Sequence, residues 1–182
     1  MPRITPITSK SDLAPEHQSA ADAVLKVFGR IRGPFSMLLH SPSLAQRLLP
    51  MVNFVRDDTM VEPRLRFPAI LTAARECGAD YVWGAQVELA RKNGIREELI
   101  DLIRAKADPA NLPVEEREVV TYTRQLIRAK RPDQAAFDAL NNKHGAQWMV
   151  ELTATAQFFA FVSGICNAFE VPPPPDGDKL QQ

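Results

Sequence analysis

Apolar residues recur along the chain at intervals of three and four positions, the spacing that gathers them on one face of an α-helix. The first such stripe covers residues 17–31 and stops at the Gly33-Pro34 pair, a strong helix breaker. A second stripe covers residues 42–56. No segment shows the alternation of a half-buried β-strand, and no repeat of fixed period is visible. The pattern therefore predicts helices joined by short turns.

The centre of the chain reads as two helices joined near Gly78. The first opens at Pro63, an early position that tolerates proline. Pro68 would strain an established helix by about 3 kcal/mol, so we expect the helix either to begin near Arg66 or to be kinked at Pro68. The second helix covers residues 79–94, where the closing glycine is predicted to end it.

The second half of the chain contains four further helical patterns. They cover residues 96–107, 113–130, 133–143 and 146–169. The last pattern is apolar on most sides, which predicts burial in the core and also at a contact between subunits. We thus expect an all-α protein with one domain and about eight helices. Its parts are an N-terminal arm (1–16), the domain (17–171) and a flexible, proline-rich tail (172–182).

Composition places the chain among ordinary globular proteins. It is 45% hydrophobic and 24% charged, and its 22 basic and 22 acidic residues give a formal net charge of zero. This balance gives no electrostatic reason to expect binding to nucleic acid or to a membrane surface. We read no spanning segment and no secretory signal. The two cysteines, Cys77 and Cys166, make no disulfide framework, so we expect a cytoplasmic location.

Several familiar catalytic motifs are absent from this sequence. It contains no glycine-rich phosphate loop, no CxxC pair, no HExxH and no GxSxG. Its three histidines are scattered, so we expect no metal and no cofactor. Cys77 and Cys166 are better read as buried packing residues than as nucleophiles. Glu151, inside an apolar helix, is read as the partner of an arginine rather than as a catalytic acid.

Four stretches carry a resemblance to a known family. They are GPFSMLLHSP, RLRFPAILTAAR, ADYVWGAQVELARKNGI and WMVELTATAQFFAFVSGICNAFEVPPP. Together they resemble the carboxymuconolactone decarboxylase and alkylhydroperoxidase D (AhpD-like) superfamily over about residues 30–172. The resemblance implies an all-helical fold that forms homo-oligomers, trimers or hexamers. It also implies one of two activities, cofactor-free decarboxylation of a lactone acid or disulfide-dependent reduction of peroxides.

The peroxidase motif of that family is missing from this sequence. Its two cysteines fall at Ala79 and Val82, its histidine at Gln86 and its glutamate at Phe67. Without a thiolate and a resolving thiol the peroxide reaction has no nucleophile. We therefore expect no thiol peroxidase activity.

The resemblance also supplies the candidate site residues. Gln86 and His40 are the candidate catalytic residues, and Phe67, Tyr81 and Trp83 are the candidates for binding substrate. Four of these five have a plainer interpretation. The two aromatic residues of the second central helix suit the core or an interface, His40 suits a helix cap or the surface, and Gln86 suits a bond to the backbone.

Two functions from different classes follow. The first is a carboxymuconolactone decarboxylase-like lyase of aromatic compound catabolism, acting without a cofactor on a small lactone or carbonyl compound. The second is a non-catalytic oligomer that binds a small apolar ligand. Both have a small molecule as partner, and neither involves nucleic acid or a membrane.

Overall fold

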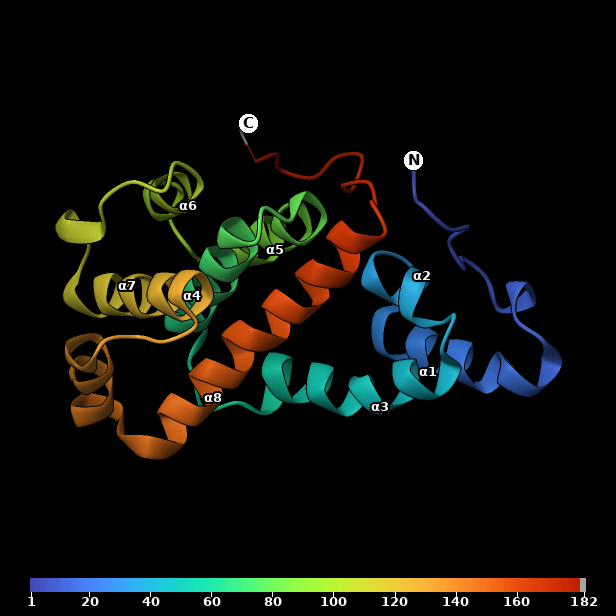
Figure 1. Ribbon diagram of the computed structural model, residues 1–182, viewed down its shortest axis with the longest axis horizontal. Coiled ribbons are helices and arrows are strands. Elements are labelled where there is room, and N and C mark those ends of the chain that lie inside the picture. Colours follow the sequence, from blue (N-terminus) through green and yellow to red (C-terminus); the bar gives the residue numbers. More distant parts are fainter. Residues whose placement is uncertain (181–182) are drawn as a thin grey trace. The chain divides into compact units, whose positions relative to one another are not determined.

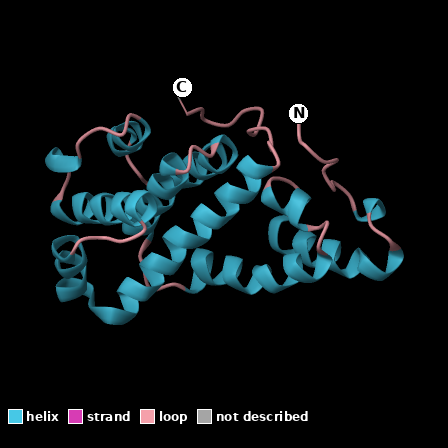
Figure 2. Ribbon diagram, in the orientation of Figure 1, coloured by secondary structure: helices cyan, strands magenta, loops and turns pink. Residues whose placement is uncertain are grey.

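The computed structural model describes residues 1–180, where helices are joined by loops and no strand is present (Figure 2). The eight helices are α1 (Gln18–Phe28), α2 (Pro34–Leu38), α3 (Pro42–Asn53), α4 (Pro63–Glu76), α5 (Asp80–Lys92), α6 (Glu97–Arg104), α7 (Val114–Ala129) and α8 (Gln134–Ala168). The predictions of an all-α fold and of about eight helices are confirmed. The segment after Gly33 forms the short helix α2, which the apolar pattern did not identify as a helix.

The described chain divides into two compact units. One holds residues 1–59 and 165–172, and the other holds residues 60–164 and the tail from Pro173. In the first unit α1 packs against α3. The N-terminal arm joins this unit through the Ile7 N–H, which donates to the Ser36 carbonyl at 3.0 Å. The expected single domain over residues 17–171 stays a prediction.

The second unit is built around α4, which packs against α7, α5 and α6 (Figure 1). A buried apolar cluster joins α4 to α7 and α8. Its members are Val61, Leu65, Ala69, Val119, Tyr122, Leu126, Leu140, Trp148, Met149, Leu152 and Ala156. Most of these side chains recur at helical spacing along their own helices, which is why the apolar stripes read from the sequence meet in one core.

Glycines with positive φ end several of the helices. Gly78 (φ 61°) separates α4 from α5, and Gly94 (φ 78°) follows α5, as the sequence predicts. Gly145 (φ 82°, ψ 171°) interrupts α8, so the predicted break between its two halves is also confirmed. Gly29 (φ 71°) ends α1 sooner than the predicted limit at residue 31. Glycine lacks the Cβ atom that makes this backbone region costly for other residues.

Helix α4 resolves the alternatives raised by Pro68. The helix begins at Pro63, with Glu62 as N-cap, and continues through Pro68 to Glu76. The alternative start near Arg66 is therefore wrong. Pro68 has no N–H to donate to the carbonyl four residues earlier, so α4 lacks one internal hydrogen bond there. Burial of Pro68 and its neighbours in the core holds the helix together across that position.

Helix α8 is buried on one side and open on another. Leu152 and Ala156 are fully buried, whereas Val150 is 67% and Phe161 is 40% exposed. By length and composition alone, α8 is the one helix in the described part that is apolar enough to cross a membrane. Half of its most apolar window is buried within the protein, as in the core helix of a soluble fold.

The described part of the C-terminal tail lies against the second unit. This part of the tail, up to Leu180, packs on α5. Asp178 fixes it there through hydrogen bonds to side chains of α5 and α6. The predicted flexibility of residues 172–182 stays a prediction, and residues 181–182 lie outside the described residues. A proline-rich composition indicates the absence of a helix, but it does not exclude docking through one well-placed carboxylate.

Candidate functional site

The candidate site is built on helix α5. This helix starts at Asp80, shortly after the turn at Gly78. The backbone N–H of Trp83 donates to the Ala79 carbonyl at 2.9 Å. The first two turns of α5 are largely buried, with Tyr81, Val82 and Trp83 all inside the protein. The side chains that follow this buried start are therefore held by a rigid, well-packed helix.

Trp83 is fully buried, and its single polar atom is paired. The indole Nε1–H donates to Oδ1 of Asp178 at 2.9 Å. The guanidinium carbon of Arg104 lies 5.6 Å from the centre of the indole ring, a cation–π contact. Trp83 therefore packs against Arg104 with its ring and donates to Asp178 through its nitrogen.

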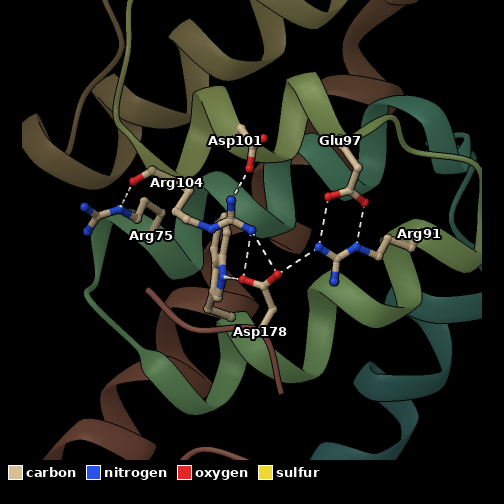
Figure 3. A network of polar contacts seen from close by, with 7 residues as sticks. Arg75, Arg91, Glu97, Asp101, Arg104 and Asp178 are labelled. Atoms are coloured by element: carbon tan, nitrogen blue, oxygen red, sulfur yellow. Dashed lines mark hydrogen bonds and ion pairs between the residues drawn. The ribbon is translucent and has the colours of Figure 1, made fainter. Parts of the chain in front are cut away.

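Asp178 is the centre of a charged network that Figure 3 shows. Nη2 of Arg104 lies 2.9 Å from both of its oxygens, and Nη2 of Arg91 lies 2.8 Å from Oδ2. Burial of Asp178 acts to raise the pKa of its carboxyl, but the hydrogen bonds from Trp83, Arg104 and Arg91 outweigh it. The pKa of Asp178 therefore lies below the ordinary value, and the group is a carboxylate at neutral pH.

The backbone of the tail approaches α5 at Gly84. A Cβ atom added to Gly84 would lie 2.9 Å from the Asp178 carbonyl oxygen and 3.3 Å from Cδ of Pro174. The first distance is shorter than real Cβ contacts allow. The absence of a side chain at Gly84 is thus what lets the tail lie against α5.

The structure places the predicted site residues as follows. Phe67 is buried on α4, and Tyr81, Trp83 and Gln86 lie on α5. Gln86 comes three residues after Trp83, so the two side chains occupy neighbouring rows of the helix. Tyr81 comes two residues before Trp83, about 200° around the helix, and so faces another side.

His40 follows α2 in the other compact unit and is exposed. Its Nε2 atom lies 2.9 Å from the Thr5 carbonyl oxygen. A carbonyl oxygen only accepts, so Nε2 carries the proton in this contact. His40 thus ties α2 to the N-terminal arm. Its predicted catalytic role, like that of Gln86, stays a prediction.

Neither Cys77 nor Cys166 forms a disulfide within residues 1–180. Burial raises the pKa of Cys77, and burial alone raises the pKa of Cys166 to about 12. A thiol with a raised pKa stays protonated at neutral pH and is a poor nucleophile. Residues 1–180 also hold no group of three or more His, Cys, Asp or Glu side chains arranged for a metal ion.

A second polar cluster surrounds Glu76 at the end of α4. Its carboxylate takes two hydrogen bonds from Arg128, at 2.6 and 2.7 Å, and lies 3.3 Å from Nζ of Lys106 and 3.8 Å from Nε of Arg124. Burial acts to raise the pKa of Glu76, but Arg128 and Lys106 outweigh it and hold the pKa below its usual value. These contacts bind α4 to α7, so we interpret the cluster as structural.

Glu151 is buried on α8 and accepts hydrogen bonds from the Met60 N–H at 2.7 Å and from the Gln147 amide at 3.0 Å. It thereby holds the start of the chain segment that leads into α4. These two contacts give Glu151 a structural role.

Sequence reasoning missed Asp178, Arg91 and Arg104. Ninety-five residues separate Asp178 from Trp83 along the chain, and 74 separate it from Arg104. No spacing rule connects positions so far apart. The available signals were weak ones: an acidic residue next to Gly177 in the tail, and a glycine inside α5 where a helix prefers a residue with a side chain.

Three solved structures share this architecture. A peroxidase-related protein from Ralstonia eutropha, described as an alkylhydroperoxidase AhpD core, superposes with a TM-score of 0.74 and covers 95% of each chain at 15% identity. The chain has the AhpD-like fold. A protein of unknown function from Agrobacterium tumefaciens, described as a candidate antioxidant defence protein AhpD, gives a TM-score of 0.70 at 17% identity. That match covers 79% of this chain and 99% of the other.

The third AhpD-like structure is the debrominase Bmp8, solved with one cysteine replaced by alanine and in complex with 2,3,4-tribromopyrrole. It gives a TM-score of 0.76 at 15% identity, covering 97% of this chain and 95% of the other. No protein-family model matches the chain, and no curated protein matches its sequence. The fold predicted from the resemblance is therefore confirmed, while identities this low show nothing about substrate or reaction.

Proposed function

We propose that the face of α5 that carries Gln86 and Trp83 binds a small, largely apolar carbonyl or lactone compound, and that the protein converts it without a cofactor. The observation that carries this proposal is the environment of Gln86. Its side chain is half-buried on a rigid helix, and its amide has no hydrogen-bond partner within residues 1–180. An amide in that position can donate to a ligand carbonyl and accept from a ligand hydroxyl.

The chemistry that suits this site is the stabilisation of an enolate. Loss of CO2 from a lactone acid leaves negative charge on an extended enolate oxygen, and a fixed N–H donor lowers the barrier to its formation. The Gln86 amide can supply that hydrogen bond, but it cannot carry a proton at neutral pH. A separate acid must reprotonate the carbon.

The proposal excludes thiol peroxidase activity. The positions that hold the two cysteines in the peroxidase motif are Ala79 and Val82, both buried. The raised pKa values of Cys77 and Cys166 support the same conclusion, because neither thiol is poised to ionise at neutral pH. Fold neighbours described as peroxidase-related do not bring that activity to a chain without the motif.

A non-catalytic ligand-binding protein is the second candidate. It is favoured by Phe67, Ala79 and Val82, three buried apolar residues at positions where the resemblance implies acid and thiol groups. The debrominase with a bound brominated pyrrole suggests that this fold accommodates a small ring compound. Apolar surroundings with one amide suit binding as well as conversion.

We also propose that the protein is a homo-oligomer that assembles through the open face of α8. Val150 and Phe161 are exposed on that helix, and the ring of Phe158 lies 6.4 Å from that of Phe161. Exposed aromatic and aliphatic side chains on one helix are typical of a contact surface. A second copy of the chain is the proposed partner.

A turnover assay separates the two functions. Carboxymuconolactone and related unsaturated lactones are incubated with the protein, and their ultraviolet absorbance is followed beside a peroxide and dithiol control. The enzymatic proposal expects turnover that falls in Gln86→Ala and persists in Gln46→Ala, which removes an exposed glutamine of α3. Binding without turnover would favour the second candidate. Equal turnover by both variants would contradict the role of Gln86.

A further inference from the structure

We propose that Trp83, Arg91 and Arg104 form a binding site for a small organic carboxylate, and that Asp178 occupies this site from within the same chain. The described tail, residues 173–180, is then a strap that an external carboxylate displaces. The inference rests on the proposed small-molecule function and adds the charge class of the ligand and the means of access.

The three donors converge on one carboxylate. Oδ1 of Asp178 accepts from Trp83 and Arg104, and Oδ2 accepts from Arg91 and Arg104. All the donor–acceptor distances are 2.8–2.9 Å, the range of strong charge-assisted hydrogen bonds. Two guanidinium groups and an indole N–H around two oxygens form a receptor for a planar anion.

The receptor side of this contact is held in place without Asp178. Arg91 makes two hydrogen bonds to Glu97, at 2.6 and 2.9 Å. Arg104 lies over the Trp83 ring. It also pairs with Asp101 (Figure 3). All these groups stand on α5 and α6, so the donors keep their positions when the tail leaves.

The strap side is held far more lightly. Its residues form no helix, and the tail's internal hydrogen bond runs from the Gly177 N–H to the Pro174 carbonyl at 2.9 Å. Asp178 accepts four hydrogen bonds that join the strap to α5 and α6. Leu180 adds one buried side chain. A non-helical segment that places one carboxylate between donors of two helices has the arrangement of a ligand bound in cis.

The receptor also needs an anion. Removal of Asp178 leaves the buried indole N–H of Trp83 and Nη2 of Arg104 without their acceptor, and leaves Nη2 of Arg91 with Glu97 alone. Glu97 and Asp101 do not compensate, because their side chains lie toward solvent and are 53% and 62% exposed. A free carboxylate restores all the lost hydrogen bonds. A neutral amide offers a single acceptor oxygen, and its NH₂ group is a donor that cannot accept from the guanidinium groups.

The strap competes with a free ligand because it is tethered. A tethered group acts at an effective concentration of roughly millimolar or more. The apparent affinity of a free ligand is its intrinsic affinity multiplied by the fraction of molecules in which the site is open. Releasing the strap should therefore strengthen binding of a free carboxylate about tenfold or more.

The test uses the full chain, crotonate as the probe and crotonamide as its neutral counterpart. Binding is followed by calorimetry and by the Trp83 indole N–H signal in ¹H–¹⁵N spectra, which a Trp148→Phe variant assigns. Asp178→Ala removes the carboxylate, and Asp176→Ala removes an exposed acid of the same tail as the matched control. Gly84→Ala displaces the tail backbone while leaving every receptor side chain in place.

The proposal expects crotonate to bind Asp178→Ala and Gly84→Ala about tenfold or more tightly than the wild type and Asp176→Ala, with crotonamide binding none of them. Adding Arg91→Gln to Asp178→Ala should abolish the gain. Equal crotonate affinity in all variants, or a gain that survives Arg91→Gln, would overturn it. Failure of the proposed function would give a different result: lactones would neither bind nor react, while the affinity for crotonate would still rise in Asp178→Ala.

Discussion

The indole N–H of Trp83 donates to the carboxylate of Asp178 at 2.9 Å and so joins the fully buried centre of α5 to the C-terminal tail. This contact links residues at distant points of the chain within one compact unit. Arg104 strengthens it by touching both partners, through its ring contact with Trp83 and its hydrogen bonds to Asp178. The tail is therefore part of the folded unit.

Docking of the tail should depend on pH in the acid range. Asp178 has a pKa below its ordinary value of 3.8 when docked, so its contribution is complete at neutral pH and is lost as the pH falls through the docked pKa. The Trp83 indole N–H signal should shift as the acid titration passes below pH 3.8. In Asp178→Asn the signal should show no such step. A step near pH 6 would point to another group and contradict this assignment.

The ion-pair cluster at Glu76 should contribute strongly to stability. Glu76 is 2% exposed and is shared by Arg128, Lys106 and Arg124, so Glu76→Gln leaves several cations without their counter-charge. We expect a loss of about 3 kcal/mol or more in the free energy of unfolding, measured with urea at neutral pH.

Glu88→Gln is the matched control for that measurement. Glu88 is 69% exposed and pairs with Lys92 one turn away, so its loss should cost about 0.5 kcal/mol or less. An equal loss of unfolding free energy in Glu76→Gln and Glu88→Gln would contradict the argument that the burial of Glu76 makes its ion pairs stabilising.

How far the sequence predicts this fold depends on the range of the interactions. Gly78, Gly94 and Gly145 mark helix boundaries correctly because a positive φ is a local requirement that glycine meets. Pro68 was harder to interpret. The free-energy cost of a proline inside a helix is set by its own ring, which is visible in the sequence. The packing that keeps α4 intact comes from residues elsewhere in the chain.

The site was less predictable than the fold. Trp83 and Gln86 were identified through a resemblance along α5, which places them on neighbouring rows of a helix. The pairing of Trp83 with Asp178 depends on where the tail returns, and the approach of the two backbones at Gly84 becomes visible only in three dimensions. A proline-rich tail carries the same local signals whether it is docked or free.

Neither cysteine should support peroxide reduction. Both thiols have raised pKa values, Cys166 near 12, so the thiolate needed for attack is scarce at pH 7. We expect peroxide consumption with a dithiol to stay at the buffer rate in the wild type, in Cys77→Ser and in Cys166→Ala. Consumption above that rate that disappears in Cys77→Ser would refute this prediction.

Substitution of Phe161 should disrupt assembly. Phe161→Glu places a charge on the open face of α8 and should shift the protein toward the monomer in sedimentation velocity experiments, with unchanged helical content. Leu44→Glu, at a residue of similar exposure on α3, should leave the assembly intact. A wild-type protein that sediments as a monomer, or equal effects of both variants, would remove the proposed interface.

The central claim is that the amide of Gln86 contacts a bound carbonyl compound, and ¹H–¹⁵N spectra of the Gln86 side chain test it most directly. An unsaturated lactone is titrated into the labelled wild type, with Gln86→Ala assigning the signals and Gln46 serving as the internal control. The account predicts saturable shifts at the Gln86 amide and none at Gln46, with binding at least about tenfold weaker in Gln86→Ala, the loss expected for a hydrogen bond to a ligand. Unchanged Gln86 signals, or equal binding by Gln86→Ala, would contradict it.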